Sequence, residues 1–286
     1  MATLNNPFVI YGYKGSEYFC DREEETEKMI SALHNERNVT LVAPRRMGKT
    51  GLVKHVFAKM EKQDKDIKCF YLDIYPAKNL DQMVGMLGSE IIGNLDSVSQ
   101  AAMRRVQEFF SKWRPTLTID EVTGRPTFSL DIRPSEGRET LKQIFEYLGQ
   151  SGKRCYIAID EFQQILDFPE SGVEALIRSY IQFFPDVYFV FSGSQQHMME
   201  EMSLSADRPF FQSSSMMTLP CIDKEKYLDF ANNFFKGQSR AMDEDTFEYI
   251  YDVSDKVTWY VQAILHGIYE HSKDVIDRQL VDDVVR

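Results

Sequence analysis

The sequence has 286 residues, 43% of them hydrophobic, and a formal net charge of −11. This length allows one large domain or two smaller ones, and the apolar content supports a substantial core and excludes a wholly disordered chain. The acidic balance disfavours a large nucleic-acid-binding surface, although it leaves room for a local basic patch.

The cysteines and the N-terminus indicate the compartment. The four cysteines are scattered without metal-type pairs, which is typical of reduced thiols. The first eight residues, MATLNNPF, have neither a basic region nor an apolar stretch of the signal-peptide kind, and no apolar run approaches the length of a membrane span. We therefore expect a cytoplasmic protein with no membrane contact.

The chain begins with an extended arm, rich in Tyr and Gly, from Asn6 to Tyr18. Asp21 is predicted to begin a helix, because a helix-capping residue followed by acids suits the positive end of the helix dipole. The residues alone leave open whether Phe19 and Arg22 serve packing and solvation or a binding role.

A phosphate-binding loop is predicted after the first strand, within NVTLVAPRRMGKTGLV (38–53). A β-branched run breaks at Ala43, and Gly48-Lys49-Thr50 opens a helix, which is the setting in which G-x-x-x-x-G-K-[ST] binds phosphate. Lys49 would neutralise terminal phosphate charge, and the Thr50 hydroxyl would ligate Mg²⁺. Ala43 replaces the usual first glycine, so the loop should leave the strand with a negative φ. The residues expected to hold the nucleotide here are Pro44, Arg45, Arg46, Met47, Gly48, Lys49, Thr50 and Gly51.

The middle of the chain alternates helix and strand. Helical spacing continues over 52–60, a second strand covers Ile67–Ile74, and helices are predicted over Leu80–Leu95 and Ala101–Trp113. The period changes over 117–132, which predicts a β-hairpin inserted near 115–134. This hairpin is either a structural flap or a contact for a partner.

The second chemical signal is RCYIAIDE (154–161), which follows a helix over 139–148. A near-continuous apolar run suits a buried parallel strand, and its carboxyl end is where open α/β sheets bind ligands. Asp160 would hold the Mg²⁺ shell through water, and Glu161 would polarise the water that attacks the γ-phosphate.

A fourth strand, VYFVF (187–191), ends in Ser192-Gly193-Ser194-Gln195. A polar side chain there could contact the γ-phosphate or its water, and the alternative is a simple turn. Arg208 precedes a fifth strand at Met216–Leu219. The residues alone leave Arg208 as a salt-bridged loop residue or a phosphate-sensing arginine, and they favour the salt bridge.

From Asp223 only helical periodicity remains, in four segments. We therefore predict a core domain over 1–220, which contains the arm and the hairpin, and a helical lid domain over 221–286. The last segment is an amphipathic helix that ends abruptly, which suggests that a further domain follows the lid or has been lost.

A family resemblance rests on seven stretches in this order: FCDREEE, APRRMGKT, YLDIY, YIAIDEFQQI, FVFSGSQ, DRPFF and TWYVQAIL. They are similar to those of the archaeal/bacterial ATPase family of AAA-like P-loop ATPases, of the signal-transduction (STAND) type. The resemblance covers nearly the whole chain. It implies an α/β fold with a parallel five-stranded P-loop NTPase sheet of order 5-1-4-3-2, flanked by helices, with the hairpin as an insertion and a C-terminal helical lid.

The resemblance also implies roles for residues. It assigns Asp160 and Glu161 to the Walker B pair and places Ser192 or Ser194 at the sensor 1 position. Arg208 matches an arginine that closes on phosphate in the same or a neighbouring subunit. The segment around Phe19 and Arg22 is similar to the part that packs near adenine.

The chain departs from the family pattern in its lid. Lys256-Val257-Thr258 stands where the family has a glycine followed two residues later by proline, which puts coupling between lid and nucleotide in doubt. The family often has a winged-helix domain after the lid, and from the sequence we do not expect one within these 286 residues.

We conclude that the sequence predicts a slow, Mg-dependent ATPase that binds ATP and ADP and acts as a nucleotide-controlled switch. The alternative is a nucleotide-binding scaffold or a DNA-associated, initiator-like adaptor with little hydrolysis. Glu161 favours the ATPase, since a pure binder needs no base, and the acidic charge disfavours direct DNA binding. The lid or the hairpin would provide the contact for a second copy or for a partner protein.

Overall fold

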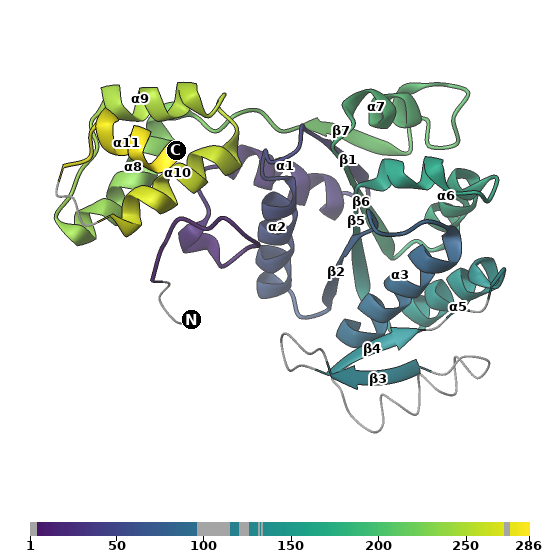
Figure 1. Cartoon of the computed structure of the whole chain (residues 1–286). Coiled ribbons are helices and arrows are strands. Elements are labelled where there is room, and N and C mark those ends of the chain that lie inside the picture. The colour runs from purple at the N-terminus through teal and green to yellow at the C-terminus, as the bar shows by residue number, and fades with distance from the viewer. Residues whose placement is uncertain (1–4, 96–114, 120–125, 131, 133, 272–274) are drawn as a thin grey trace. The chain divides into compact units, whose positions relative to one another are not determined.

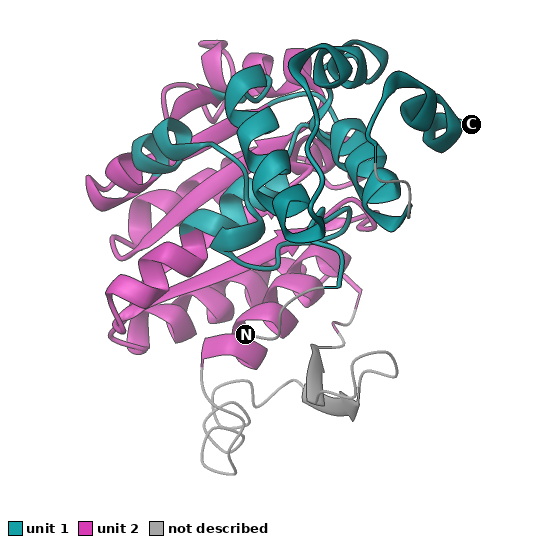
Figure 2. Cartoon of the chain, turned by 90° about the vertical axis from the view of Figure 1, so that its left-hand side faces the viewer, with its two compact units in different colours: residues 1–29, 43–56, 218–286 teal, residues 30–42, 57–217 magenta. Residues whose placement is uncertain are grey.

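The computed structural model describes residues 5–95, 115–119, 126–130, 132, 134–271 and 275–286. The chain forms two compact units, coloured separately in Figure 2. Unit 1 comprises Met1–Met29, Ala43–Val56 and Thr218–Arg286, and unit 2 comprises Ile30–Val42 and Phe57–Met217. Each unit therefore gathers segments that are far apart in the sequence.

Unit 2 is built on a five-stranded sheet in the order β2-β5-β6-β1-β7 (Figure 1). Its strands are β1 (Asn38–Val42), β2 (Ile67–Asp73), β5 (Arg154–Asp160), β6 (Val187–Gly193) and β7 (Ser214–Thr218). Neighbours β2–β5, β5–β6 and β6–β1 pair in parallel. Numbered along the chain, the order is 2-3-4-1-5, which is the predicted 5-1-4-3-2 order read from the opposite edge. The predicted fold class is confirmed.

The helices of unit 2 cover this sheet. They are α3 (Leu80–Leu95), α5 (Gly137–Gln150), α6 (Val173–Phe183) and α7 (Gln196–Leu204), with a 3₁₀ helix, η2, at Phe162–Asp167. Apolar side chains of α3, α5 and α6 share one hydrophobic core with β5 and β6. Helix α6 was not predicted. Within the described residues, no helix has both the length and the apolar character needed to cross a bilayer.

Two further helices each contain residues of both units: α1 (Glu23–His34) and α2 (Lys49–Gln63). Helix α1 begins at Glu23, so the predicted start at Asp21 is wrong. Asp21 and Arg22 have φ values of 55° and 77°, which are left-handed rather than helical. The Asp21 carboxylate instead accepts a hydrogen bond from Lys226 Nζ at 2.7 Å.

The predicted hairpin is present. Strands β3 (Pro115–Ile119) and β4 (Pro126–Leu130) pair antiparallel, with Leu117 opposite Phe128. The helix that we predicted over Ala101–Trp113 lies outside the described residues.

Unit 1 contains the helices of the predicted lid. They are α8 (Lys224–Phe235), α9 (Glu244–Val253), α10 (Thr258–Glu270) and α11 (Arg278–Val285), with short 3₁₀ helices η1 (Ser16–Tyr18) and η3 (Lys236–Gln238). Their hydrophobic core includes Phe8 of the N-terminal arm, which is fully buried 5.2 Å from the ring of Phe235. The arm is tied to α10 as well, since Trp259 Nε1 donates to Ile10 O at 3.0 Å. The sequence did not reveal this packing.

Candidate active site

The phosphate-binding loop follows β1 directly and leads into α2 within unit 1. Left-handed backbone occurs at Arg46 (φ 69°) and Gly48 (φ 95°), while Ala43 is not among the described residues with positive φ. The loop therefore leaves the strand as expected for a residue with a Cβ. The Lys49 ammonium donates to Ala43 O at 2.7 Å and to Pro44 O at 3.1 Å, so the side chain lies along the inside of the loop.

The first turn of α10 contacts this loop. Trp259 N–H donates to Arg46 O at 3.0 Å, and Thr258 Oγ1 donates to Met47 O at 3.3 Å. The Arg46 guanidinium lies 4.9 Å and 5.0 Å from the ring centroids of Trp259 and Tyr260 and also donates to the Tyr260 hydroxyl. The lid thus contacts the loop although the glycine-x-proline motif is missing.

An aromatic cluster flanks α2 in the same unit. The Phe19 ring stacks on His55 at 4.4 Å, and the Tyr13 hydroxyl shares a 3.0 Å hydrogen bond with His55 Nδ1. A Cβ at Gly51 would lie 3.4 Å from the Phe19 ring, which is an ordinary van der Waals distance, so the ring lies directly against this part of α2. Of these aromatic residues, we had singled out only Phe19. The signal for His55 is its position one helical turn after Gly51.

Arg22, predicted beside Phe19 near adenine, is only 3% exposed. Its Nη1 donates to Glu25 at 3.2 Å, and its Nη2 has no hydrogen-bond partner among the described residues. Tyr227 of α8 is near this guanidinium. Burial raises the pKa of Tyr227, and the charge of Arg22 opposes part of that rise. Arg22 is therefore a buried charge at the lid helices rather than a solvated one.

The two predicted carboxylates lie at the carboxyl end of β5, in unit 2. Asp160 is buried and accepts hydrogen bonds from the Tyr71 hydroxyl and, at 3.0 Å, from Glu161 N–H. Tyr71 belongs to the neighbouring strand β2, where Asp73 is in register with Asp160. Sequence reasoning missed Tyr71, because nothing local relates it to a residue 89 positions away.

Glu161 has left-handed backbone, with φ 53° and ψ 42°. Such a conformation costs a non-glycine residue about 1–3 kcal/mol and is common at functional sites. Its Oε2 accepts hydrogen bonds from Ser194 Oγ at 2.7 Å and from Gln163 Nε2 at 2.5 Å. The chain therefore turns sharply after β5 and holds this carboxylate by two donors.

The two candidate serines have different surroundings. Ser194 follows β6 and donates to Glu161. Ser192 lies within β6, is 1% exposed, and its Oγ has no hydrogen-bond partner among the described residues. The structure thus brings Ser194, and not Ser192, to the carboxylate.

Arg208 forms two ion pairs in unit 2. Its guanidinium lies 2.9 Å from Glu174 and 2.8 Å from Glu201. Burial raises the pKa of Glu174, and the nearby Arg208 opposes part of that rise. These contacts are those of the salt-bridged loop residue that the bare sequence favoured, and they leave the phosphate-sensing role as a proposal.

The chain offers oxygen donors for Mg²⁺. Thr50 provides a hydroxyl and Asp160 a carboxylate, and Mg²⁺ prefers such hard oxygen ligands while retaining waters and phosphate oxygens. Across the described part of the chain, no three or more His, Cys, Asp or Glu residues are grouped to hold a metal by themselves. Each of these two oxygen donors is therefore of the kind that can ligate Mg²⁺ beside phosphate and water.

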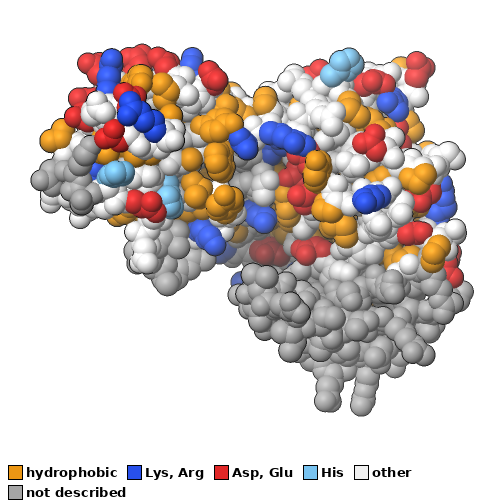
Figure 3. All heavy atoms as spheres, viewed as in Figure 1, with side chains coloured by type: hydrophobic (Ala, Val, Ile, Leu, Met, Phe, Trp, Pro, Cys, Tyr) orange, Lys and Arg blue, Asp and Glu red, His pale blue; other side chains and the backbone are white. Residues whose placement is uncertain are grey.

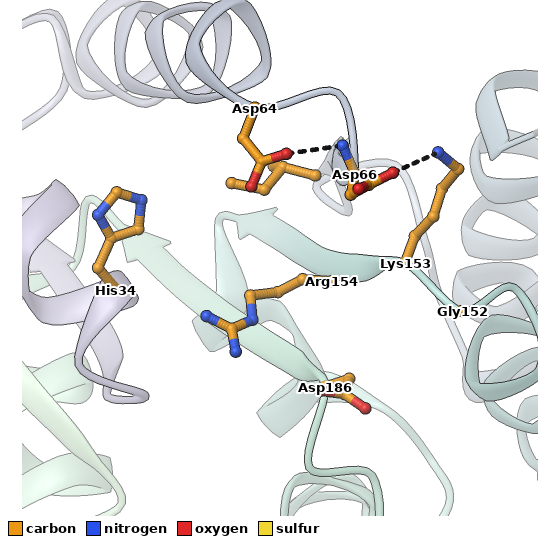
Figure 4. A pocket seen from close by; sticks show the side chains of 8 residues that line it. His34, Asp64, Asp66, Gly152, Lys153, Arg154 and Asp186 are labelled. Carbon is orange, nitrogen blue, oxygen red and sulfur yellow. Dashed lines mark hydrogen bonds and ion pairs between the residues drawn. The ribbon is translucent and has the colours of Figure 1, made fainter.

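A polar hollow of about 530 Å³ lies in unit 2 at the amino ends of the strands, away from the carboxyl ends that carry Asp160 and Glu161 (Figure 4). Arg154 begins β5 there, and Asp186 directly precedes β6. Its charges are partly paired with each other, since Lys153 Nζ lies 4.0 Å from Asp66. Ligands of open α/β sheets bind at the carboxyl ends of the strands, so this hollow is not the candidate active site.

Comparison with known proteins identifies the relatives of the chain. Residues 19–264 match a family described as an ATPase domain predominantly from Archaea. Two uncharacterized ATP-binding proteins of Methanocaldococcus jannaschii are similar, one with 26% identity over 206 residues and the other with 23% over 295 residues. The alignments cover 68% and 92% of this chain. They cover 54% and 76% of those proteins, so the chain spans about half the length of the first.

Solved structures share the fold. A Walker-type ATPase of Pyrococcus abyssi matches with a TM-score of 0.70 and 17% identity, covering 98% of this chain and 75% of that one. The ORC1 protein of Aeropyrum pernix, solved in complex with DNA, matches with a TM-score of 0.65 and 14% identity, covering 98% and 69%. A RuvB mutant of Thermotoga maritima matches at 0.55 and 11%, covering 94% and 71%.

Proposed function

The chain belongs to the ATPase domain family found predominantly in Archaea, and from that premise we propose that it is a Mg-dependent ATPase whose lid responds to the bound nucleotide. Family and fold make it a nucleotide-binding P-loop ATPase in general terms. Our proposal adds the metal, the residue roles and the switch.

The observation that carries the switch is the contact between α10 and the phosphate-binding loop. The Arg46 guanidinium interacts with Trp259 and Tyr260, and such cation–π contacts contribute about 0.5–2 kcal/mol each. A phosphate bound in the loop would compete for the same guanidinium through stronger, charge-assisted hydrogen bonds. Nucleotide binding would therefore favour an arrangement of α10 in which Arg46 contacts phosphate and not the two rings. The free energy that drives this change is the difference between the phosphate and the cation–π interactions.

The residue roles follow from the chemistry of each side chain. Lys49 would turn from the loop carbonyls to the terminal phosphates, while the backbone N–H groups of Arg45 to Gly51 surround the phosphate oxygens. Pro44 has no N–H and contributes only its carbonyl. Thr50 and Asp160 would hold Mg²⁺, which when bound neutralises phosphate charge. Glu161 would accept a proton from the attacking water.

MgATP at about 100 times its Kd should raise the Tm by several degrees, because it adds roughly 2.7 kcal/mol to the free energy of unfolding. Lys49→Ala should abolish this rise, since it removes the cation that faces the terminal phosphates. Thermal unfolding with and without MgATP measures both effects, and EDTA should stop phosphate release by the parent protein.

The matched control is Lys59→Ala, which removes an exposed lysine further along α2 and should keep the full rise. Equal shifts in the Lys49→Ala and parent proteins would show that this loop does not hold the phosphates.

Trp259 should report the lid response by fluorescence. Trp113→Phe leaves Trp259 as the remaining tryptophan of the two in the sequence. In that background, saturating MgATP should change the Trp259 emission, because the guanidinium at its ring is withdrawn toward phosphate. Arg46→Ala should remove most of the change, whereas Arg45→Ala deletes the same charge from the loop and should preserve it. Emission that stays constant while the Tm rises would contradict the switch.

The alternative, a scaffold or DNA-associated adaptor with little hydrolysis, has less support. Over helices α8 to α11, the Lys and Arg side chains on the face shown in Figure 3 are interspersed with acidic ones. That described surface therefore offers no continuous basic patch for a phosphate backbone. A DNA titration of the phosphate-release assay distinguishes the two, since an adaptor would bind DNA and release little phosphate.

A further inference from the structure

Gln163 is a buried polar residue of η2 that lies within the stretch YIAIDEFQQI but has no role assigned to it by the resemblance or by the proposed function. It is 3% exposed, and its Nε2 donates to Glu161 Oε2 at 2.5 Å. Ser194 Oγ donates to the same oxygen at 2.7 Å. Neither hydrogen bond involves Glu161 Oε1. The two donors thus fix one carboxylate oxygen and leave the other to accept a proton.

Packing alone does not explain a glutamine at this position. Its Oε1 is buried without a hydrogen-bond partner among the described residues, and burying an unpaired amide oxygen is unfavourable. A methionine would fill a similar volume without that cost. Among the described residues, the polar partner recorded for this side chain is Glu161.

The end of β6 makes room for this side chain. A Cβ at Gly193 would lie 2.4 Å from Gln163 Oε1 and 2.6 Å from Met199 Cγ, so only glycine fits while Gln163 stays in place. Gly193 directly precedes Ser194, the second donor. The segment Gly193-Ser194 therefore leaves space for the Gln163 side chain and also provides the other hydrogen-bond donor to Glu161.

We propose that Gln163, together with Ser194, is a positioning residue that orients the Glu161 carboxylate for hydrolysis. This inference rests on the proposed function, in which Glu161 is the base. The left-handed backbone of Glu161 aims the side chain, and the two hydrogen bonds fix its rotation about the last torsion. If Glu161 loses this orientation, the protein should bind ATP as well as before. The carboxylate should accept a proton from the attacking water less efficiently.

Gln163→Met should lower kcat about ten- to a hundredfold, the scale on which misoriented catalytic groups lose rate. The KM for ATP and the MgATP-induced rise in Tm should stay within twofold of the parent values. The same substitution made in a Glu161→Gln protein should cause no further loss, because groups that act as a unit are not additive. Steady-state phosphate release in both backgrounds gives these values.

Gln163→Glu keeps the volume of the side chain and tests the same point should Gln163→Met fold poorly. In the parent background it places a second carboxyl group beside Glu161. Two carboxyl groups this close share one proton, so Glu161 is no longer a free base and kcat should fall at least as much. In the Glu161→Gln background, the amide at position 161 can donate to the carboxylate at position 163. Gln163→Glu should therefore cause no further loss of turnover in that background. Gln164→Met is the matched control, since Gln164 is the adjacent, half-buried glutamine, and it should retain parental turnover.

The outcomes separate this inference from the proposed function. Turnover that is low in Glu161→Gln but parental in both Gln163 variants would overturn the positioning role alone. Equal losses from the Gln163 variants in both backgrounds would show a purely structural role and overturn it as well. Parental turnover in Glu161→Gln would overturn the proposed role of Glu161, and the role of Gln163 with it.

Discussion

Glu161→Gln should lower ATP turnover by about 100-fold or more while ATP affinity stays near the parental value, the usual scale for a lost general base. The substitution preserves the shape of the side chain. An amide oxygen can still accept the hydrogen bonds from Ser194 and Gln163, so the surroundings of β5 should hold. What is lost is the capacity to accept a proton from water. Phosphate release measures turnover, and the MgATP-induced shift in Tm measures binding.

The control for this experiment is Asp167→Asn, which removes an exposed carboxylate from the same 3₁₀ helix that follows Glu161. It should leave both turnover and binding unchanged. A parental rate of phosphate release in Glu161→Gln would instead favour the scaffold alternative.

We also propose that Arg208 reaches the γ-phosphate during hydrolysis, as the family resemblance implies. Arg208→Ala should then slow hydrolysis by about 10³-fold while ATP still binds, because a guanidinium supplied in the transition state contributes on that scale. In the structure the guanidinium is paired with Glu174 and Glu201, so it must exchange these partners for phosphate. The Glu201 side chain is 47% exposed, so its pair contributes little stability, whereas the Glu174 side chain is only 12% exposed and its pair is the one that costs more to break.

The ion pairs provide the matched controls for Arg208. Glu201→Gln removes one partner but keeps the arginine, and it should leave hydrolysis near the parental rate. Mixing Arg208→Ala with Lys49→Ala subunits should restore activity if the arginine acts on a neighbouring subunit, and sedimentation must then show self-association. Normal hydrolysis by Arg208→Ala would leave it as the salt-bridged loop residue.

The sequence by itself determined the sheet and the two chemical signals. Apolar runs such as YIAI in β5 are buried on both faces of a parallel sheet, and that pattern is visible locally. The phosphate-binding loop and the two carboxylates could be predicted as well, because each comes directly after an apolar run that forms a strand, β1 and β5 respectively. Ligands of parallel sheets bind at these carboxyl ends. The resemblance to a known family added the order of the strands, which the structure confirmed.

Local patterns were less reliable where a side chain is recruited from elsewhere. Asp21 looked like the start of a helix because acids follow it, but its carboxylate pairs with Lys226, and α1 begins at Glu23. The residues alone left open whether Arg22 is solvated or has a binding role, and only the structure shows that it is buried. At Asp21 a partner 205 residues away overrides the local preference.

Only the tertiary structure decided which residues surround each candidate group. Ser192 and Ser194 are equivalent by sequence, and the end of β6 is what brings Ser194 to Glu161. Phe8 carries no local sign that it completes the core of helices 224–285. Periodicity shows that a side chain will be buried, but it does not show which distant segment will bury it, because that depends on how segments far apart in the chain pack together. The contact of Trp259 with the phosphate-binding loop and the hydrogen bond from Gln163 to Glu161 both depend on this packing.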